Sequence, residues 1–200
     1  MIIGLEGVSC VGKSTLAAAL AAQLGEVLIV PCYHHVAPHP SSRPRLDAFT
    51  APAQLANVRM LMRLEALRHR QAARAAAAGR HVLLDRTIDT VLAHAHAVGR
   101  MAGFDCDAAA RDLVLAGPLT VPDVTLLLFA SPAVLAARAA SRVDMPSMLY
   151  APPFAVGFYD HFADRPLTGH CHWLDATVAA EQVVEHAATV IDARLPGVLA

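Results

Sequence analysis

The 200-residue sequence predicts one α/β domain with three layers, in which helices cover both faces of a parallel sheet. Five short apolar runs suited to buried strands alternate with Ala- and Leu-rich segments suited to helices. With 56% hydrophobic and 16% charged residues, the chain can bury one substantial core. A glycine-rich segment follows the first apolar run and precedes a helix-forming run. Because ligands of such sheets bind at the carboxyl ends of the strands, functional residues are expected there.

The first half of the chain contains three strand-like runs and two helix-forming segments. Gly25 closes the first helix, Pro31 ends the second strand, and Thr50 can cap a long helix that Gly79 terminates. The predicted order is a strand over 2–6, a helix over 14–24, a strand over 26–30, a loop to about 50, a helix over 51–78 and a strand over 81–85.

The second half continues the alternation with two further strands. The predicted order is helices over 88–101 and 107–116, a strand over 124–129, a helix over 132–141, a mobile Pro-containing segment over 142–157, a strand over 172–175 and a closing helix over 178–194. We therefore expect a single domain over residues 1–200.

Charge, hydropathy and cysteine spacing exclude several classes of protein. A net charge of −1 provides no basic field for nucleic acid, and no apolar run reaches the ~18–20 residues of a membrane-spanning helix. The start of the chain lacks the basic and apolar regions of an export signal, so a cytoplasmic location is expected. The four cysteines lack a CxxC spacing, which favours reduced thiols over a disulfide framework.

A phosphate-binding loop is the strongest functional signal. Residues 7–15 match GxxxxGK[ST] at every fixed position, and chance gives such a match in a chain of this composition roughly 2 times in 10,000. Lys13, within the motif, is the single lysine of a chain that contains 15 arginines. This placement indicates a need for a compact ammonium group at this point.

The chemistry of this loop predicts ATP and Mg²⁺ as ligands. The glycines allow successive N–H groups to point inward, and the following helix adds the positive end of its dipole. Lys13 is expected to reach the β- and γ-phosphates and Ser14 to ligate Mg²⁺. The expected nucleotide-binding residues are Gly7, Ser9, Cys10, Val11, Gly12, Lys13, Ser14 and Thr15, of which Cys10 and Thr15 are better suited to shaping the loop.

Asp85 and Arg86 follow the apolar run 81–84 and are expected beside this loop. The Asp85 carboxylate can hold Mg²⁺ through water or accept a proton from an attacking hydroxyl group. Arg86 can balance charge on a transferring phosphoryl group. The alternatives are a helix cap for Asp85 and a surface ion pair for Arg86.

Several segments in the same order resemble the thymidylate kinases and the related deoxyribonucleoside kinases. These are Gly7–Thr15, Asp85-Arg86-Thr87, the stretch from Val121-Pro122-Asp123-Val124 to Arg138 and Arg142, and Trp173-Leu174-Asp175-Ala176-Thr177 with Glu181-Gln182-Val183. The resemblance implies the P-loop NTPase fold of nucleoside-monophosphate kinases, with five parallel strands and a small lid, here at 138–157. It also implies phosphoryl transfer from ATP with Mg²⁺, and homodimers are common in these families.

The resemblance also implies roles for several arginines. Arg86 would touch the transferring or acceptor phosphate, and Arg138 and Arg142 would be lid cations that close on ATP. Arg63 resembles the helix arginine that faces the acceptor, and Arg59 lies one helical turn earlier. The alternative for Arg59 and Arg63 is a solvated helix face.

The segment after the second strand departs from these families. They usually carry a Glu there, often before Pro, whereas this chain has Pro31-Cys32-Tyr33-His34-His35. Tyr33 and His34 are candidates for the acceptor pocket. A zinc site formed by Cys32, His34, His35 and His39 is the less favoured interpretation, because the spacing matches no recognised zinc motif.

These observations predict an ATP-dependent small-molecule kinase whose acceptor is a nucleoside or a nucleoside monophosphate. The alternatives are a kinase of another hydroxylated metabolite, such as a sugar or an antibiotic-like compound, and a nucleotide-dependent switch. A switch for GTP is disfavoured because the guanine-specificity motif NKxD needs a second lysine.

Overall fold

The five predicted apolar runs form one parallel sheet in the computed structural model, which describes residues 1–39, 43–142, 145–194 and 196–197. The strand order is β2-β3-β1-β4-β5, and neighbouring strands pair in parallel throughout. The bounds are β1 Ile2–Glu6, β2 Val27–Val30, β3 His81–Asp85, β4 Val124–Phe129 and β5 Cys171–Asp175. The prediction of a five-stranded parallel sheet is confirmed.

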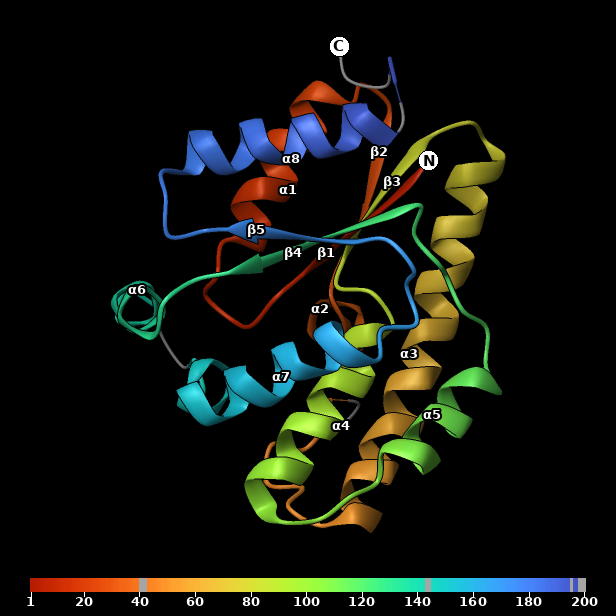
Figure 1. Cartoon of the computed structure of the whole chain (residues 1–200). Coiled ribbons are helices and arrows are strands. Elements are labelled where there is room, and N and C mark those ends of the chain that lie inside the picture. Colours follow the sequence, from red (N-terminus) through yellow and green to blue (C-terminus); the bar gives the residue numbers. More distant parts are fainter. Residues whose placement is uncertain (40–42, 143–144, 195, 198–200) are drawn as a thin grey trace.

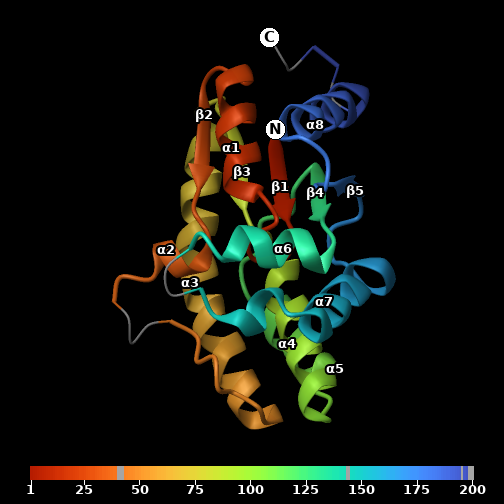
Figure 2. The ribbon, with the colours of Figure 1, turned by 90° about the vertical axis from the view of Figure 1, so that its left-hand side faces the viewer.

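Helices cover both faces of this sheet, as Figures 1 and 2 show. Helices α1 and α8 lie on one face, and α3, α4, α5 and α7 lie on the other. The bounds are α1 Lys13–Gln23, α2 Tyr33–Val36, α3 Ala51–Ala77, α4 Asp89–Ala102, α5 Asp107–Leu115, α6 Pro132–Ala139, the 3₁₀ helix η2 Ser147–Tyr150, α7 Pro152–Asp164 and α8 Ala180–Arg194.

Strands β1 and β4 are buried on both faces of the sheet, which explains why their sequences are mostly apolar. Ile3, Leu5 and Leu126 are fully buried in the main core. Gly4 lets the chain after β3 approach β1 closely, since a Cβ atom at Gly4 would lie 2.4 Å from Cγ2 of Thr87. This close approach brings the end of β3 against the end of β1.

Two predicted irregular segments contain helices. The segment 142–157 holds η2 and the start of α7, and residues 143 and 144 of it lie outside the described part. Pro152 occupies the first turn of α7, where a proline starts a helix instead of breaking one. A Cβ atom at Gly157 would lie 2.7 Å from Cα of Ala97, so α7 packs very closely against α4. The predicted loop 31–50 contains the short helix α2.

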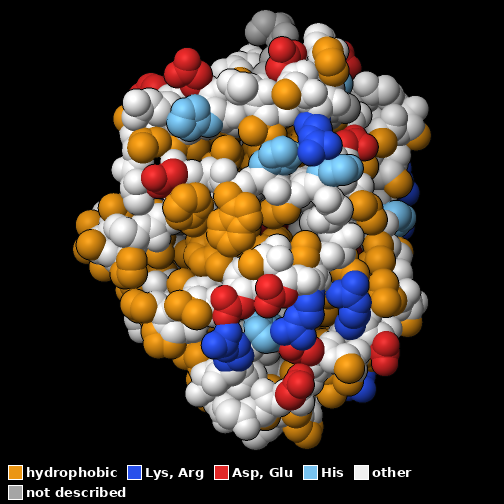
Figure 3. All heavy atoms as spheres, in the orientation of Figure 1, with side chains coloured by type: hydrophobic (Ala, Val, Ile, Leu, Met, Phe, Trp, Pro, Cys, Tyr) orange, Lys and Arg blue, Asp and Glu red, His pale blue; other side chains and the backbone are white. Residues whose placement is uncertain are grey.

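The surface in Figure 3 shows hydrophobic side chains gathered over the region between β5 and α7. Below this region, basic and acidic side chains are interspersed, and Arg165 pairs with Asp107 at 3.0 Å. In the part of the chain that the structure describes, no helix combines the length and apolarity needed to cross a bilayer.

Candidate nucleotide-binding and acceptor site

The glycine-rich loop joins β1 to α1 at the carboxyl edge of the sheet. Gly7 and Gly12 have φ values of 132° and 116°, and Cys10 has a φ of 67°. Over the described residues, no hydrogen bond engages the backbone N–H groups of Cys10, Val11 and Gly12. Three unpaired N–H groups next to the start of an eleven-residue helix form an environment suited to an anion.

Two cationic side chains converge on one carbonyl oxygen of this loop. The Lys13 Nζ donates to the Gly7 carbonyl at 2.8 Å and to the Val8 carbonyl at 2.8 Å. Arg86 Nη1 donates to the same Gly7 carbonyl at 3.2 Å and to Thr90 Oγ1 at 3.2 Å. The loop therefore concentrates positive charge beside its unpaired N–H groups.

This environment lowers the pKa of Lys13 to about 7. Burial has the largest effect, and the charge of Arg86 lowers the pKa further. Asp85, Glu6 and Cys32 act in the opposite direction. Burial and the charge of Arg86 thus disfavour the Lys13 ammonium, and a polyphosphate would supply a counter-charge.

Glu6 is a buried carboxylate that the sequence analysis did not select. It accepts hydrogen bonds from Thr87 N at 2.6 Å, Thr87 Oγ1 at 2.8 Å and Thr90 Oγ1 at 2.6 Å. Burial raises its pKa, and the charge of Arg86 and the threonine hydrogen bonds partly offset that effect. Glu6 thereby attaches the turn after β3 to the end of β1. The sequence offers one signal for a role of Glu6, which is its position directly before Gly7 of the phosphate-binding loop.

Asp85 lies half-buried at the end of β3, and Arg86 follows in a left-handed conformation with a φ of 73°. A non-glycine residue in this region carries strain that the surrounding contacts must hold. The Arg86 N–H donates to the Leu5 carbonyl at 3.0 Å. Arg86 thus lies beside the phosphate-binding loop, and Asp85 directly precedes it at the end of β3.

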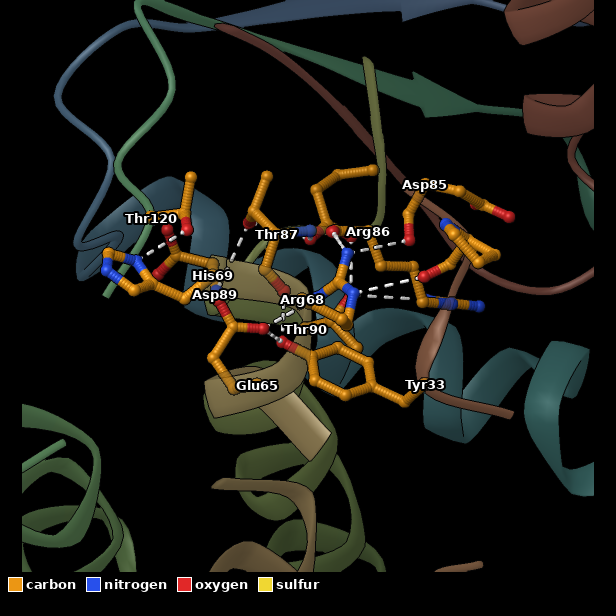
Figure 4. Close-up of polar contacts among 12 residues, drawn as sticks. Tyr33, Glu65, Arg68, His69, Asp85, Arg86, Thr87, Asp89, Thr90 and Thr120 are labelled. Atoms are coloured by element: carbon orange, nitrogen blue, oxygen red, sulfur yellow. Dashed lines mark hydrogen bonds and ion pairs between the residues drawn. The ribbon is translucent and has the colours of Figure 1, made fainter. Parts of the chain in front are cut away.

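A buried arginine holds the ends of β2 and β3 together (Figure 4). Arg68 of α3 donates to the Pro31 carbonyl at 3.0 Å, to the Asp85 carbonyl at 3.1 Å and to the Arg86 carbonyl. It pairs with Glu65 at 2.7 Å, and its guanidinium group lies over the Tyr33 ring. This contact set makes Arg68 the arginine of α3 that reaches the site.

The residues predicted to bind the acceptor differ in burial. Arg59 and Arg63 are exposed on α3 and make no hydrogen bond or ion pair with any other described residue. Tyr33 is buried, and its hydroxyl donates to Glu65 at 2.8 Å and to the Thr87 carbonyl at 3.2 Å. Tyr33 therefore supports the site from beneath, while the side chain of His34 is exposed.

The predicted lid segment contacts the loop through two residues. Arg138 of α6 donates to the Val11 carbonyl at 2.9 Å and to the Ala176 carbonyl at 2.9 Å. The Leu149 carbonyl of η2 accepts from the Ser9 N–H at 3.2 Å. Arg142 is exposed beyond the end of α6, and Ser14 and Thr15 are exposed at the start of α1.

Comparison with known proteins identifies the family. Residues 2–148 match the family described as AAA domain (AAA_33), which is well over half of the chain. The chain belongs to this AAA domain family. No curated protein matches the chain in sequence.

Solved structures share the fold of this AAA domain over nearly all of its length. One is deoxyadenosine kinase from M. mycoides with products bound, with a TM-score of 0.74, 15% identity, and coverage of 96% of this chain and 100% of that chain. The same enzyme with bound dATP gives a TM-score of 0.67, 16% identity, and coverage of 96% and 100%. Thymidylate kinase from Ehrlichia chaffeensis gives a TM-score of 0.67, 19% identity, and coverage of 96% and 98%. The predicted kinase-like fold is confirmed.

One further side chain of this AAA domain lies near Arg86. His94 is on α4, one turn after Thr90, and its ring meets Phe154 of α7 edge-on at 5.3 Å between centroids. Burial, and then the charge of Arg86, lower the pKa of His94 to about 4. The ring is therefore neutral at pH 7 and can both donate and accept a hydrogen bond. The sequence analysis did not single out His94, because an isolated histidine on a helix carries no distinguishing pattern.

Proposed function

We propose that this AAA domain is an ATP-dependent kinase that transfers the γ-phosphoryl group to a nucleoside or a nucleoside monophosphate. The convergence of Lys13 and Arg86 on the Gly7 carbonyl, beside three unpaired N–H groups, carries this proposal. Two cations on one carbonyl repel each other, and a polyphosphate would neutralise both. Phosphoryl transfer relies on such positioned positive charge, because charge in the transition state spreads over the γ-oxygens.

Each residue has a chemical role in this proposal. The loop N–H groups and Lys13 would bind the phosphates, and Arg86 would stabilise charge on the transferring group. Arg138 and Arg142 would approach the nucleotide from the lid side. The exposed Ser14 hydroxyl and the Asp85 carboxylate are oxygen ligands that suit Mg²⁺, which when bound neutralises phosphate charge.

The role of Asp85 depends on the acceptor. If the acceptor presents a hydroxyl group, Asp85 is the base that accepts its proton. If the acceptor presents a phosphate, no base is needed, and Asp85 serves the metal ion and the orientation of Arg86. The fold shared with deoxyadenosine kinase and thymidylate kinase supports a nucleoside-type acceptor of one of these two kinds.

The test measures ADP release from Mg·ATP across nucleosides, nucleoside monophosphates and other hydroxylated metabolites, with mass spectrometry of each product. We expect transfer to a nucleoside or a nucleotide, and the product mass distinguishes a hydroxyl from a phosphate acceptor. Lys13→Ala and Asp85→Ala should each abolish transfer while circular dichroism stays unchanged. Arg194→Ala, on the exposed end of α8, is the control that should retain activity.

The segment after β2 favours a second candidate, a kinase of another hydroxylated metabolite. It presents a thiol and imidazole groups at the acceptor side. Transfer only to non-nucleoside alcohols would support this candidate. Slow ATP hydrolysis with no small-molecule acceptor would contradict both and favour a nucleotide-dependent switch.

A further inference from the structure

The structure brings together three side chains of different chemistry at the carboxyl ends of β2 and β3. The Cys32 thiol, the His35 imidazole and the Asp85 carboxylate each offer one ligand atom, and these atoms all lie within 4.8 Å of one another. We propose that Cys32, His35 and Asp85 form a binding site for a thiophilic divalent ion of the Zn²⁺ class. This site shares Asp85 with the Mg²⁺ proposed to accompany ATP, and Cys32 and His35 distinguish it from that Mg²⁺ site.

The distance between the sulfur and nitrogen ligand atoms suits tetrahedral coordination. Bond lengths of about 2.3 Å to sulfur and about 2.0–2.1 Å to nitrogen separate the two ligand atoms by about 3.6 Å across a tetrahedral angle. Cys32 Sγ and His35 Nδ1 lie 3.4 Å apart. An ion could therefore enter between them without a rearrangement of the backbone.

The backbone that carries Cys32 and His35 forms one hydrogen-bonded helical turn. Cys32 precedes the first residue of α2, and its carbonyl accepts from the N–H groups of His35 at 2.9 Å and Val36 at 3.1 Å. This single turn places the thiol and the imidazole on the same side. A spacing of three residues on one helical turn is a common way to present two metal ligands.

Arg68 fixes Asp85 relative to this turn. Its guanidinium group donates both to the Pro31 carbonyl, directly before Cys32, and to the Asp85 carbonyl. Figure 4 shows Arg68 between these strand ends, with Tyr33 beneath it. This buried network holds the backbone of Asp85 and of the residue before Cys32, and it leaves the three ligand side chains available for an ion. Support of the backbone around the ligands lowers the ordering cost of binding a metal ion.

The ligand set selects the class of ion. Mg²⁺ prefers oxygen ligands in octahedral geometry, whereas a thiolate with an imidazole and a carboxylate suits Zn²⁺ or Co²⁺. Cys32 and Asp85 are half-buried and His35 is exposed, so an ion can enter from solvent. Three protein ligands leave a fourth position open, as in catalytic zinc sites.

The open fourth coordination position would give the ion a role in the proposed function, and this role rests on that function. Cys32 and Asp85 are close enough to Lys13 to influence its pKa, so the ion would lie beside the phosphate site. An oxygen atom of the acceptor is the ligand that fits the fourth position. The ion would orient and polarise this oxygen, while Asp85 retains its second carboxylate oxygen for the role described above.

The experiment titrates the metal-free full-length protein with Co²⁺ and follows near-ultraviolet absorption from thiolate-to-cobalt charge transfer. We expect one ion per chain and displacement of Co²⁺ by Zn²⁺. Cys32→Ser should remove the absorption band, and serine is a favourable residue at this N-cap position. His35→Ala should weaken binding by at least the 10- to 100-fold that is typical of losing an outer-shell partner. His34→Ala, on the neighbouring exposed residue, is the matched control and should bind as the wild type does.

Two results would overturn the proposal: no charge-transfer band, or binding that is unchanged in both Cys32→Ser and His35→Ala. The Lys13→Ala variant separates this proposal from the kinase proposal. It should bind Co²⁺ normally while losing phosphoryl transfer. Metal binding without any phosphorylated acceptor would leave the ion site standing and remove the proposed role of its open position.

Discussion

Binding of ATP should change the protonation state of Lys13. In the ligand-free protein the pKa of this side chain is about 7, because burial and Arg86 disfavour the ammonium form. A triphosphate beside the ammonium would favour the charged form and raise the pKa towards its usual range. Nucleotide binding above pH 7 should therefore be accompanied by proton uptake.

The number of protons taken up per ATP follows from the pKa of Lys13. With a value of about 7, the Lys13 amine is about 90% neutral at pH 8 and about 50% neutral at pH 7. We expect uptake of about 0.9 proton per ATP at pH 8 and about 0.5 at pH 7. The γ-phosphate of ATP is almost fully ionised at pH 8, so its own titration contributes little there.

Isothermal titration calorimetry in buffers of different ionisation enthalpy measures this uptake directly. The titration uses ATP in EDTA, so that a metal ion does not contribute. Lys13→Arg is the comparison variant, because a guanidinium group stays charged at every pH used and should show no uptake. If the wild type takes up no proton between pH 7 and pH 8.5, the argument for a neutral Lys13 is refuted.

Three further predictions concern the support of the site. Arg68→Met leaves the buried Glu65 carboxylate without its cationic partner and should lower the free energy of unfolding in urea by about 3–5 kcal/mol, whereas the exposed Arg70→Met should change it little. Gly157→Ala should lower the free energy of unfolding by about 1–3 kcal/mol, because its Cβ would meet the backbone of α4. The control is Gly169→Ala, where space is open, and a loss for Gly157→Ala no larger than for this control would contradict the prediction. Burial acts to raise the pKa of Asp89, but four hydrogen bonds outweigh it, so this pKa lies below 3.8. The contribution of Asp89 to the free energy of unfolding should be complete above pH 4 and should be lost as the pH falls through the folded-state pKa. The acid unfolding of the Asp89→Asn variant should lack this contribution.

Local patterns were sufficient to predict the sheet and the phosphate-binding loop. The predicted strands coincide with β1, β3 and β4, because central parallel strands are apolar on both faces and their runs are unmistakable. The loop motif combines fixed glycines with a lysine at set spacing, so its conformation depends little on the rest of the chain. Helix α7 was missed because its start looks like a proline-rich turn, and only its aromatic contacts with α4 and the core explain the fold of this segment.

The buried polar residues could not be predicted from sequence. Arg63 and Arg68 lie on the same helix, and the position of α3 relative to the strand ends decides that Arg68 reaches the site. Glu6 looks like the last residue of a strand until Thr87 and Thr90 are placed against it. The Glu6 contacts join residues 81 and 84 positions apart, and the Arg68 contacts join residues 17 and 37 positions apart. They therefore follow from tertiary packing and from no local pattern.

The phosphate-binding loop connects these observations to stability. Two cationic side chains that converge on one carbonyl oxygen repel each other. Burial and Arg86 lower the pKa of Lys13, which reduces this repulsion, while Arg86 keeps its hydrogen bonds to the Gly7 carbonyl and Thr90. A bound polyphosphate would reverse the balance, because it would pair with both cations and with the loop N–H groups. The same residues would therefore provide the affinity for the proposed nucleotide, and the buried contacts of Glu6 and Arg68 hold them in place.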